Sequence, residues 1–206
     1  MSAPLFKQDI LFTQRILAVA GFYKGARDGK WNAGCDAAEA DFDAESRRIA
    51  AELGTFDPRS EANILTLLPV AQKKCREFMD AVSQWPVGQV KILSGTRTYA
   101  EQNALYALGR TKPGRKVTNA RGGFSNHNFG IAWDVGIFVG GVYYQGKNAK
   151  EDRAYDDLAA YLKNSVRGLA WGGDWKSIVD KPHYQLVAGN DVGRCRAMLE
   201  EGKAYA

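Results

Sequence analysis

The sequence predicts an α+β protein: a small three-helix N-terminal domain, then an antiparallel sheet flanked by helices. Apolar residues recur at helical spacing through most of residues 10–82. Segments rich in β-branched and aromatic residues follow at 90–94, 131–138 and 183–187, and these are typical of strands. Gly140 and Gly141 can turn the chain back as a hairpin, which favours antiparallel neighbours. At 206 residues and 45% hydrophobic content, the chain can bury one core or two small ones.

Three helices are expected before the sheet, at residues 10–20, 36–53 and 60–68. Gly21 provides a stop for the first of them, and a turn at Asp28-Gly29 precedes the second. A fourth helix follows from Pro69, which suits a first turn, to about residue 84. We place a domain boundary just before this fourth helix, between residues 66 and 67.

The later helices are predicted from end signals or, at residues 155–165, from apolar residues on one side. Thr98 and Glu101 form a capping box that begins a helix ending near Gly109, so Arg97 lies at a corner between strand and helix. A helix is also expected at residues 155–165. Asn190 can cap a last helix that runs to residue 201.

Charge and cysteine content limit the partners and the compartment. A net charge of +5 and a pI near 9.1 favour an anionic partner such as nucleic acid, a membrane surface or the bacterial wall, unless the charge only aids solubility.

Cys35, Cys75 and Cys195 are odd in number and have no metal-like spacing, so we expect reduced, buried thiols. No leader peptide and no apolar run of about 20 residues is evident, and we expect synthesis in a cytoplasm without export.

Both histidines of the chain lie near a carboxylate. His127 stands in SNHNFGIAWD seven positions before Asp134, and His183 ends the segment DKPH that begins at Asp180. Zinc accepts imidazole nitrogen and carboxylate oxygen, and a catalytic zinc keeps three protein ligands and an open position for water. We therefore predict a Zn2+ site of His127, Asp134 and His183, with Asp180 close enough to hold the water. The alternative is that these residues are structural or solvated.

The same segments carry a resemblance to a known family. Ser125, His127, Gly130, Ala132 and Asp134 match the pattern S-x-H-x-x-G-x-A-x-D. This pattern resembles the zinc peptidases that cut D-amino-acid bonds in peptidoglycan, a family with D-Ala-D-Ala carboxypeptidases and phage L-alanyl-D-glutamate endopeptidases. The segment SGTRT at 94–98, followed by Gln102, Leu105 and Tyr106, extends the resemblance. The resemblance implies a zinc peptidase domain at residues 67–206.

A second, shorter resemblance covers the N-terminal helices. It rests on the patterns Q-x-x-L, G-x-Y-x-G and D-G-x-W, carried by Gln14, Leu17, Gly21, Tyr23, Gly25, Asp28, Gly29 and Trp31. These residues resemble the three-helix peptidoglycan-binding domain of wall hydrolases, which implies a domain of this kind at residues 1–66. The family has Gly after the Trp, where this chain has Asn32. The alternative is that the aromatic residues are only the core of a small domain.

The roles of the site residues follow from this interpretation. Zinc lowers the pKa of its water toward about 7 and polarises the scissile carbonyl. Asp180 is expected to act as general base and then as acid. The family's arginine, Arg97 here, holds substrate and stabilises the oxyanion, unless it is only a surface arginine paired with a carboxylate. Ser125, Gln102 and Trp171 are the predicted substrate-binding residues, although the tryptophans of WGGDW could equally fill a core.

The predicted function is that of an endolysin-like peptidoglycan hydrolase cleaving the L-Ala-D-Glu bond of wall stem peptides. Asp180 in D-x-P-H favours this activity, because the phage type commonly carries Asp where carboxypeptidases often have Glu. The alternatives are a D-Ala-D-Ala carboxypeptidase and a non-catalytic zinc-containing wall-binding protein. We expect a monomer whose partner is bacterial peptidoglycan, with no nucleic acid and no stable membrane insertion. A phage-encoded chain would leave the host cytoplasm through a membrane-permeabilising partner.

Overall fold

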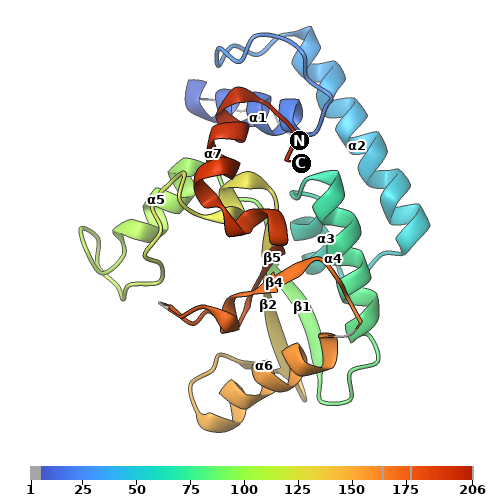
Figure 1. The fold of residues 1–206 in the computed structure, drawn as a ribbon, viewed down its shortest axis with the longest axis vertical. Helices are drawn as coiled ribbons and strands as arrows, with labels where there is room; N and C mark the ends of the chain where they lie inside the picture. Colours follow the sequence, from blue (N-terminus) through green and yellow to red (C-terminus); the bar gives the residue numbers. More distant parts are fainter. Residues whose placement is uncertain (1–5, 164, 177, 206) are drawn as a thin grey trace.

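The computed structural model describes residues 6–163, 165–176 and 178–205, and it confirms the α+β class. A five-stranded antiparallel sheet crosses the middle of the molecule, with helices packed around it (Figure 1). Before the sheet the chain forms the helices α1 (Lys7–Val19), α2 (Ala33–Leu53), α3 (Pro58–Ile64) and α4 (Pro69–Val82). The four N-terminal helices predicted from apolar spacing are therefore present.

The ends of these helices have local causes. The side chain of Asn32 accepts hydrogen bonds from the first turn of α2, and Asp57 does the same for α3. The helix predicted to reach residue 68 ends at Ile64, and it could not have included Leu68, which precedes Pro69. A residue before proline is disfavoured in the helical region, and Leu68 is extended, with ψ at 149°.

The sheet is built on its longest strand, β2. Its strands are β1 (Gln89–Ser94), β2 (Ala132–Val139), β3 (Val142–Tyr144), β4 (Leu169–Trp171) and β5 (His183–Leu186), in the order β1-β2-β5-β4. Strand β3 pairs with the C-terminal end of β2, across the turn of Gly140 and Gly141, as predicted. Strand β4 was not predicted. In the pairing of β2 with β5, Asp134 lies directly opposite His183.

One face of the sheet packs on helices and the other carries polar groups. Phe78 of α4 contacts Trp133 and Tyr184 edge to face, with ring centroids 5.9 and 4.8 Å apart. Because side chains alternate along a strand, this contact places their neighbours Asp134 and His183 on the opposite face. Helix α6 (Ala149–Leu162) joins α4 in the same apolar core.

The N-terminal helices contribute to that core. Ile16 and Val19 of α1 belong to the same buried cluster as the sheet residues, while Tyr23 and Phe42 are in a smaller separate one. The hydroxyl of Ser60 in α3 accepts a hydrogen bond of 2.9 Å from the backbone N–H of Ile92 in β1. This hydrogen bond therefore joins the two sides of the boundary predicted between residues 66 and 67. The boundary stays a prediction.

The remaining helices are α5 (Tyr99–Ala107) and α7 (Val192–Glu201). The capping box of Thr98 and Glu101 is confirmed. The cap predicted for the last helix is wrong: Asp191 accepts from the backbone of Arg194, whereas Asn190 accepts from the side chain of Gln185. Helix α6 begins at Ala149 instead of residue 155, because Asn148 caps it through the backbone N–H of Glu151.

All three cysteines are free and buried, as expected from their number and spacing. Of the helices in the described residues, none has the length and apolar composition needed to cross a bilayer.

Candidate metal centre

The three residues predicted as metal ligands converge on one point. The distances are 3.1 Å from His127 Nε2 to Asp134 Oδ1, 3.2 Å from His127 Nε2 to His183 Nδ1, and 3.3 Å from His183 Nδ1 to Asp134 Oδ1. Ligands at 2.0–2.1 Å from a tetrahedral zinc ion lie about 3.3 Å from one another. The three donor atoms therefore already have the spacing that one such ion requires.

Two local structures bring these residues together. His127 lies in a short 3-10 helix, η1 (Asn126–Phe129), which ends at Gly130 in the left-handed region with φ at 69°. A Cβ atom at Gly130 would lie 2.9 Å from Leu68 Cγ, so glycine also permits close packing there. The cross-strand pair of Asp134 and His183 supplies the other two donors.

Each imidazole is held by its other nitrogen. His127 Nδ1 lies 2.7 Å from the carbonyl oxygen of Gly95, and His183 Nε2 lies 3.0 Å from Gln185 Oε1. Because a carbonyl or amide oxygen only accepts, each of these ring nitrogens carries the proton. His127 Nε2 and His183 Nδ1 are then left with lone pairs directed at the same place, as metal-ligating histidines require.

The donor set fits a divalent cation. Two nitrogen lone pairs and a carboxylate oxygen within 3.3 Å of one another repel unless a positive charge lies among them. Two imidazoles and one carboxylate are also a ligand set found in catalytic zinc sites. The residues of this chain are therefore able to hold zinc.

Burial and mutual charge set the protonation of the ligands. Burial lowers the pKa of His127, against the opposing effect of Asp134, and so favours the neutral ring. Burial alone would raise the pKa of Asp134, but His127 and His183 hold it well below its usual range. Both directions favour the forms that bind a metal, whereas the hydrogen bond and charge of Asp134 raise the pKa of His183 despite its burial.

Arg97 and Gln102 form a chain behind the carboxylate ligand. Arg97 Nη2 donates to Asp134 Oδ2 at 3.0 Å, and Arg97 Nη1 donates to Gln102 Oε1 at 2.9 Å. Gln102 is fully buried and donates in turn to the carbonyl oxygen of Ala120. This arrangement favours a role for Gln102 in orienting Arg97, and its predicted contact with substrate stays a prediction.

The three candidate ligands open into a cleft of 1060 Å³, which is also lined by Arg97, Ser125 and Asp180. Burial, and next the nearby Asp134 carboxylate, raises the pKa of the Asp180 carboxyl. A carboxylate with a raised pKa beside an open cleft is suited to accept and return a proton. The residues predicted for chemistry thus share one cavity.

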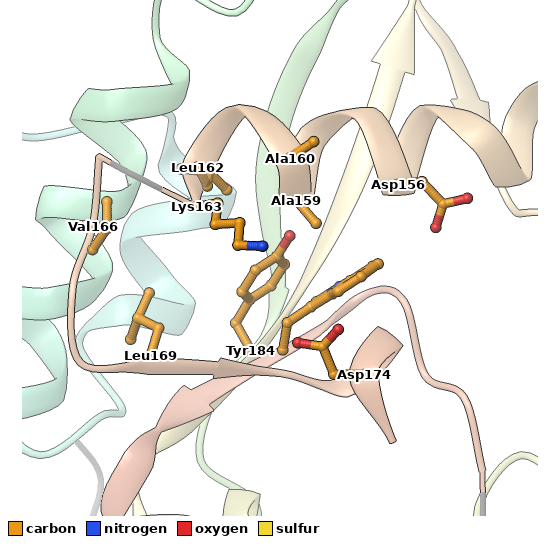
Figure 2. Close-up of a pocket in the computed structure, with 10 residues that line it drawn as sticks. Asp156, Ala159, Ala160, Leu162, Lys163, Val166, Leu169, Asp174 and Tyr184 are labelled. Atoms are coloured by element: carbon orange, nitrogen blue, oxygen red, sulfur yellow. The ribbon is translucent and has the colours of Figure 1, made fainter. Parts of the chain in front are cut away.

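The structure places the two tryptophans of WGGDW differently. Trp171 lines another hollow, of 330 Å³, between α6 and β4, where Tyr184 and Asp174 also lie (Figure 2). Its indole N–H donates to the carbonyl oxygen of Lys181 at 2.7 Å. Trp175 instead lines the cleft, and its ring centroid is 4.8 Å from that of His183. The geometry favours Trp175 over Trp171 for a contact with substrate.

Several residues that support the site were missed in the sequence. Asn126 Nδ2 donates to Gln185 Oε1 and to the carbonyl oxygen of Gly189, and so fixes the amide that holds His183. A signal for Gln185 exists, because it stands two positions after His183 on a strand and must share its face. No comparable spacing marks Asn126, whose partners lie about 60 residues later in the chain.

Comparison with known proteins adds to this geometry. Residues 118–186 match the D-alanyl-D-alanine carboxypeptidase family. This match includes His127, Asp134, Asp180 and His183, and it stops short of Arg97. It covers a third of the chain, so the similarity concerns the segment that builds the candidate centre.

A curated relative extends the similarity. The chain is 40% identical over 105 residues to the peptidoglycan L-alanyl-D-glutamate endopeptidase CwlK of Bacillus subtilis strain 168. The aligned part is 48% of this chain and 60% of the relative, so the chain spans less than two thirds of the relative's length. Among solved structures, the L-Ala D-Glu endopeptidase ChiX of Serratia marcescens aligns with 66% of this chain and 91% of its own, at 24% identity and a TM-score of 0.47.

Proposed function

We propose that this protein is a zinc-dependent peptidase that cleaves the stem peptides of bacterial peptidoglycan. The observation that carries the proposal is the convergence of His127 Nε2, Asp134 Oδ1 and His183 Nδ1, with both imidazoles held by their other nitrogens. The match to the D-alanyl-D-alanine carboxypeptidase family and the similarity to CwlK support it.

The chain's own residues have distinct tasks in this reaction. A zinc ion held by the three ligands would supply Lewis acidity, which would lower the pKa of a water to about 7 and polarise a carbonyl. Asp180 accepts a proton from the attacking water and returns it to the leaving amine. Arg97 fixes the orientation of Asp134 and presents positive charge where the carbonyl oxygen becomes negative. Ser125 orients the substrate from the wall of the cleft.

The bond we propose is that between L-Ala and D-Glu, because CwlK is named for this specificity and D-x-P-H contains Asp180. Removal of a terminal D-Ala is the second candidate, favoured by the description of the matching family. The two activities differ in product. Cleavage at L-Ala-D-Glu creates a new amino terminus on D-Glu, whereas carboxypeptidase activity releases a single D-Ala.

Digestion of purified muropeptides by the zinc-loaded protein, followed by mass spectrometry, tests the proposal. We expect peptides that begin with D-Glu, and no product after treatment with a chelator. Activity should return on addition of zinc, because the chelator removes the ion and leaves its three ligands in place. Release of D-Ala alone would support the carboxypeptidase instead. Stoichiometric zinc without any product would leave only a zinc-containing wall-binding protein.

We also propose that the N-terminal helices bind peptidoglycan, which their sequence patterns and the net charge of +5 support. Gln14 and Tyr23 of these patterns are themselves buried, and Gln14 accepts from the backbone of Gly29 and donates to that of Lys30. Wall binding would therefore depend on the exposed residues around them. Sedimentation of the catalytically inactive chain with insoluble peptidoglycan measures it, and equal retention by bare cellulose would count against it.

The biological setting follows as a proposal from the same residues. The D-x-P-H segment is the feature that favours a phage lysis protein. We propose that such a protein acts as a monomer and reaches the wall from the host cytoplasm through a membrane-permeabilising partner. Light scattering on the purified protein measures the monomer. Expression inside a bacterial host, with and without a permeabilising protein, measures the need for release: lysis by the chain alone would contradict it.

A further inference from the structure

Phe124 lines the cleft, and two arginines stack on its ring. Phe124 lines the cleft beside Ser125 and is 42% exposed. The guanidinium carbons of Arg121 and Arg196 lie 4.7 and 4.4 Å from the centroid of the Phe124 ring. Both cations therefore stack on one aromatic ring, which favours each of them electrostatically. We call Arg121, Phe124 and Arg196 the arginine platform.

The guanidinium groups of the platform have no ion-pair partner in the described residues. Within the described residues, neither guanidinium forms an ion pair with a carboxylate, although Glu200 lies one helical turn from Arg196 on α7. Two like charges stacked on one ring repel each other, and an anion bound to either guanidinium group would relieve that repulsion. Guanidinium groups also have the planar fork that binds a carboxylate with two hydrogen bonds. The platform is thus suited to a carboxylate.

Hydrogen bonds connect the loop that carries Phe124 to the segments that surround the metal centre. The buried Asn128 accepts from the backbone N–H of Gly123 at 2.9 Å and donates to the carbonyl oxygens of Arg97 and Thr98, at 2.8 and 3.2 Å. The Gly123 backbone lies against Arg196, since a Cβ atom there would be 3.4 Å from Arg196 Cδ. The loop that carries Phe124 is therefore fixed relative to Arg97 and to η1.

The distance from the platform to the centre suits a substrate peptide. Phe124 precedes His127 by three residues, which separates their Cα atoms by at most about 11 Å. A peptide whose scissile carbonyl lies at the three ligands can therefore place a carboxylate one to three residues away on the platform.

We propose that the arginine platform binds a free carboxylate of the wall stem peptide and makes the protein selective for anionic stems. The inference rests on the proposed function. A γ-linked D-Glu keeps its α-carboxylate next to the bond we expect to be cleaved, and the carboxyl end of the stem is the other source. Amidation of either group removes the charge with little change in shape.

The test compares three synthetic stem peptides with identical residues: one with all carboxylates free, one amidated at the D-Glu α-carboxyl, and one amidated at its carboxyl end. Binding of each to the zinc-free full-length chain is measured by calorimetry, and KM and kcat are measured with the zinc-loaded chain. We expect Kd and KM to rise about tenfold for one amidated peptide, since a charge-assisted hydrogen bond is lost. Which peptide loses affinity identifies the carboxylate that is bound.

The double variant Arg121→Gln, Arg196→Gln should bind all three peptides equally and weakly, with kcat and zinc content unchanged. Arg153→Gln is the matched control, because Arg153 is an exposed arginine on α6, with a side chain 81% exposed, and should behave as the unaltered chain. Equal affinity of the unaltered chain for all three peptides would overturn the platform, whether or not any is cleaved. Selective binding without cleavage would support the platform and remove the proposed peptidase function.

Discussion

The amide of Gln185 determines which nitrogen of His183 is free to bind metal. Its oxygen accepts from His183 Nε2 and from Asn126 Nδ2, while its own N–H donates to Asn190. The amide orientation is therefore fixed by partners on two sides. Residues of this kind tune metal affinity without touching the ion.

Replacing Gln185 tests this contribution. In Gln185→Leu the His183 ring loses its acceptor, and we expect zinc affinity to fall about 10- to 100-fold. Gln185→Glu keeps an acceptor oxygen and should retain most of the affinity. Competition with a fluorescent zinc chelator measures both variants. Equal affinity in the leucine variant would mean that His183 is oriented by other contacts.

Asp180 offers a second test at the level of one side chain. It lines the cleft with a raised pKa, and it lies three positions before the ligand His183. Asp180→Asn should keep zinc but lower kcat by about 10²- to 10⁴-fold, because general acid–base catalysis is lost. Asp174→Asn, at an exposed carboxylate of the same segment, is the control. Unchanged kcat in Asp180→Asn would remove this residue from the mechanism.

Among the elements, the pairing of β2 with β5 assembles most of the centre. Asp134 and His183 are cross-strand partners, and a shift of the register by one residue would move one of them to the face packed on α4. Trp133 and Tyr184 hold the register, because both contact Phe78 on that apolar face. Packing on the apolar face of the sheet thus keeps Asp134 and His183 together on the opposite face.

The contact between α3 and α4 contains a buried ion pair. Arg76 of α4 is fully buried, and it donates to both carboxylate oxygens of Glu61 at 2.8 and 2.9 Å. Glu61→Gln leaves a buried cation without its counter-charge, and we expect a loss of about 3–5 kcal/mol in the free energy of unfolding. Urea unfolding measures it.

The matched control for Glu61→Gln is Glu52→Gln. Glu52 pairs with Arg48 on the surface of α2, where both side chains are more than half exposed. Exposed pairs of this kind contribute about 0.3–0.5 kcal/mol, so the control should be nearly neutral. Similar losses of unfolding free energy in both variants would show that the burial of Arg76 does not increase the contribution of its ion pair to stability.

At the scale of the whole molecule, the N-terminal helices share contacts with the sheet. Ile16 and Val19 of α1 lie in the same core as the sheet, and Ser60 and Asn63 of α3 bond to the backbone of Ile92. We expect a fragment of residues 67–206 to lack a cooperative thermal transition, because its core and the edge of β1 would be exposed. A fragment with a sharp transition and zinc binding would support the predicted boundary.

The sequence by itself determined the helices, most of the strands and the identity of the three candidate ligands. Local signals were sufficient for most elements, because caps, glycines and apolar spacing act within a few residues. The three ligands were identified from the only two histidines of the chain and from the family pattern between Ser125 and Asp134. The tertiary structure decided what depends on distant partners: Asn190 bonds to Gln185 instead of capping α7, Trp175 and not Trp171 faces the cleft, and Gln102 lies behind Arg97. These roles follow from which side chains meet across the sheet, and spacing along one chain does not encode that.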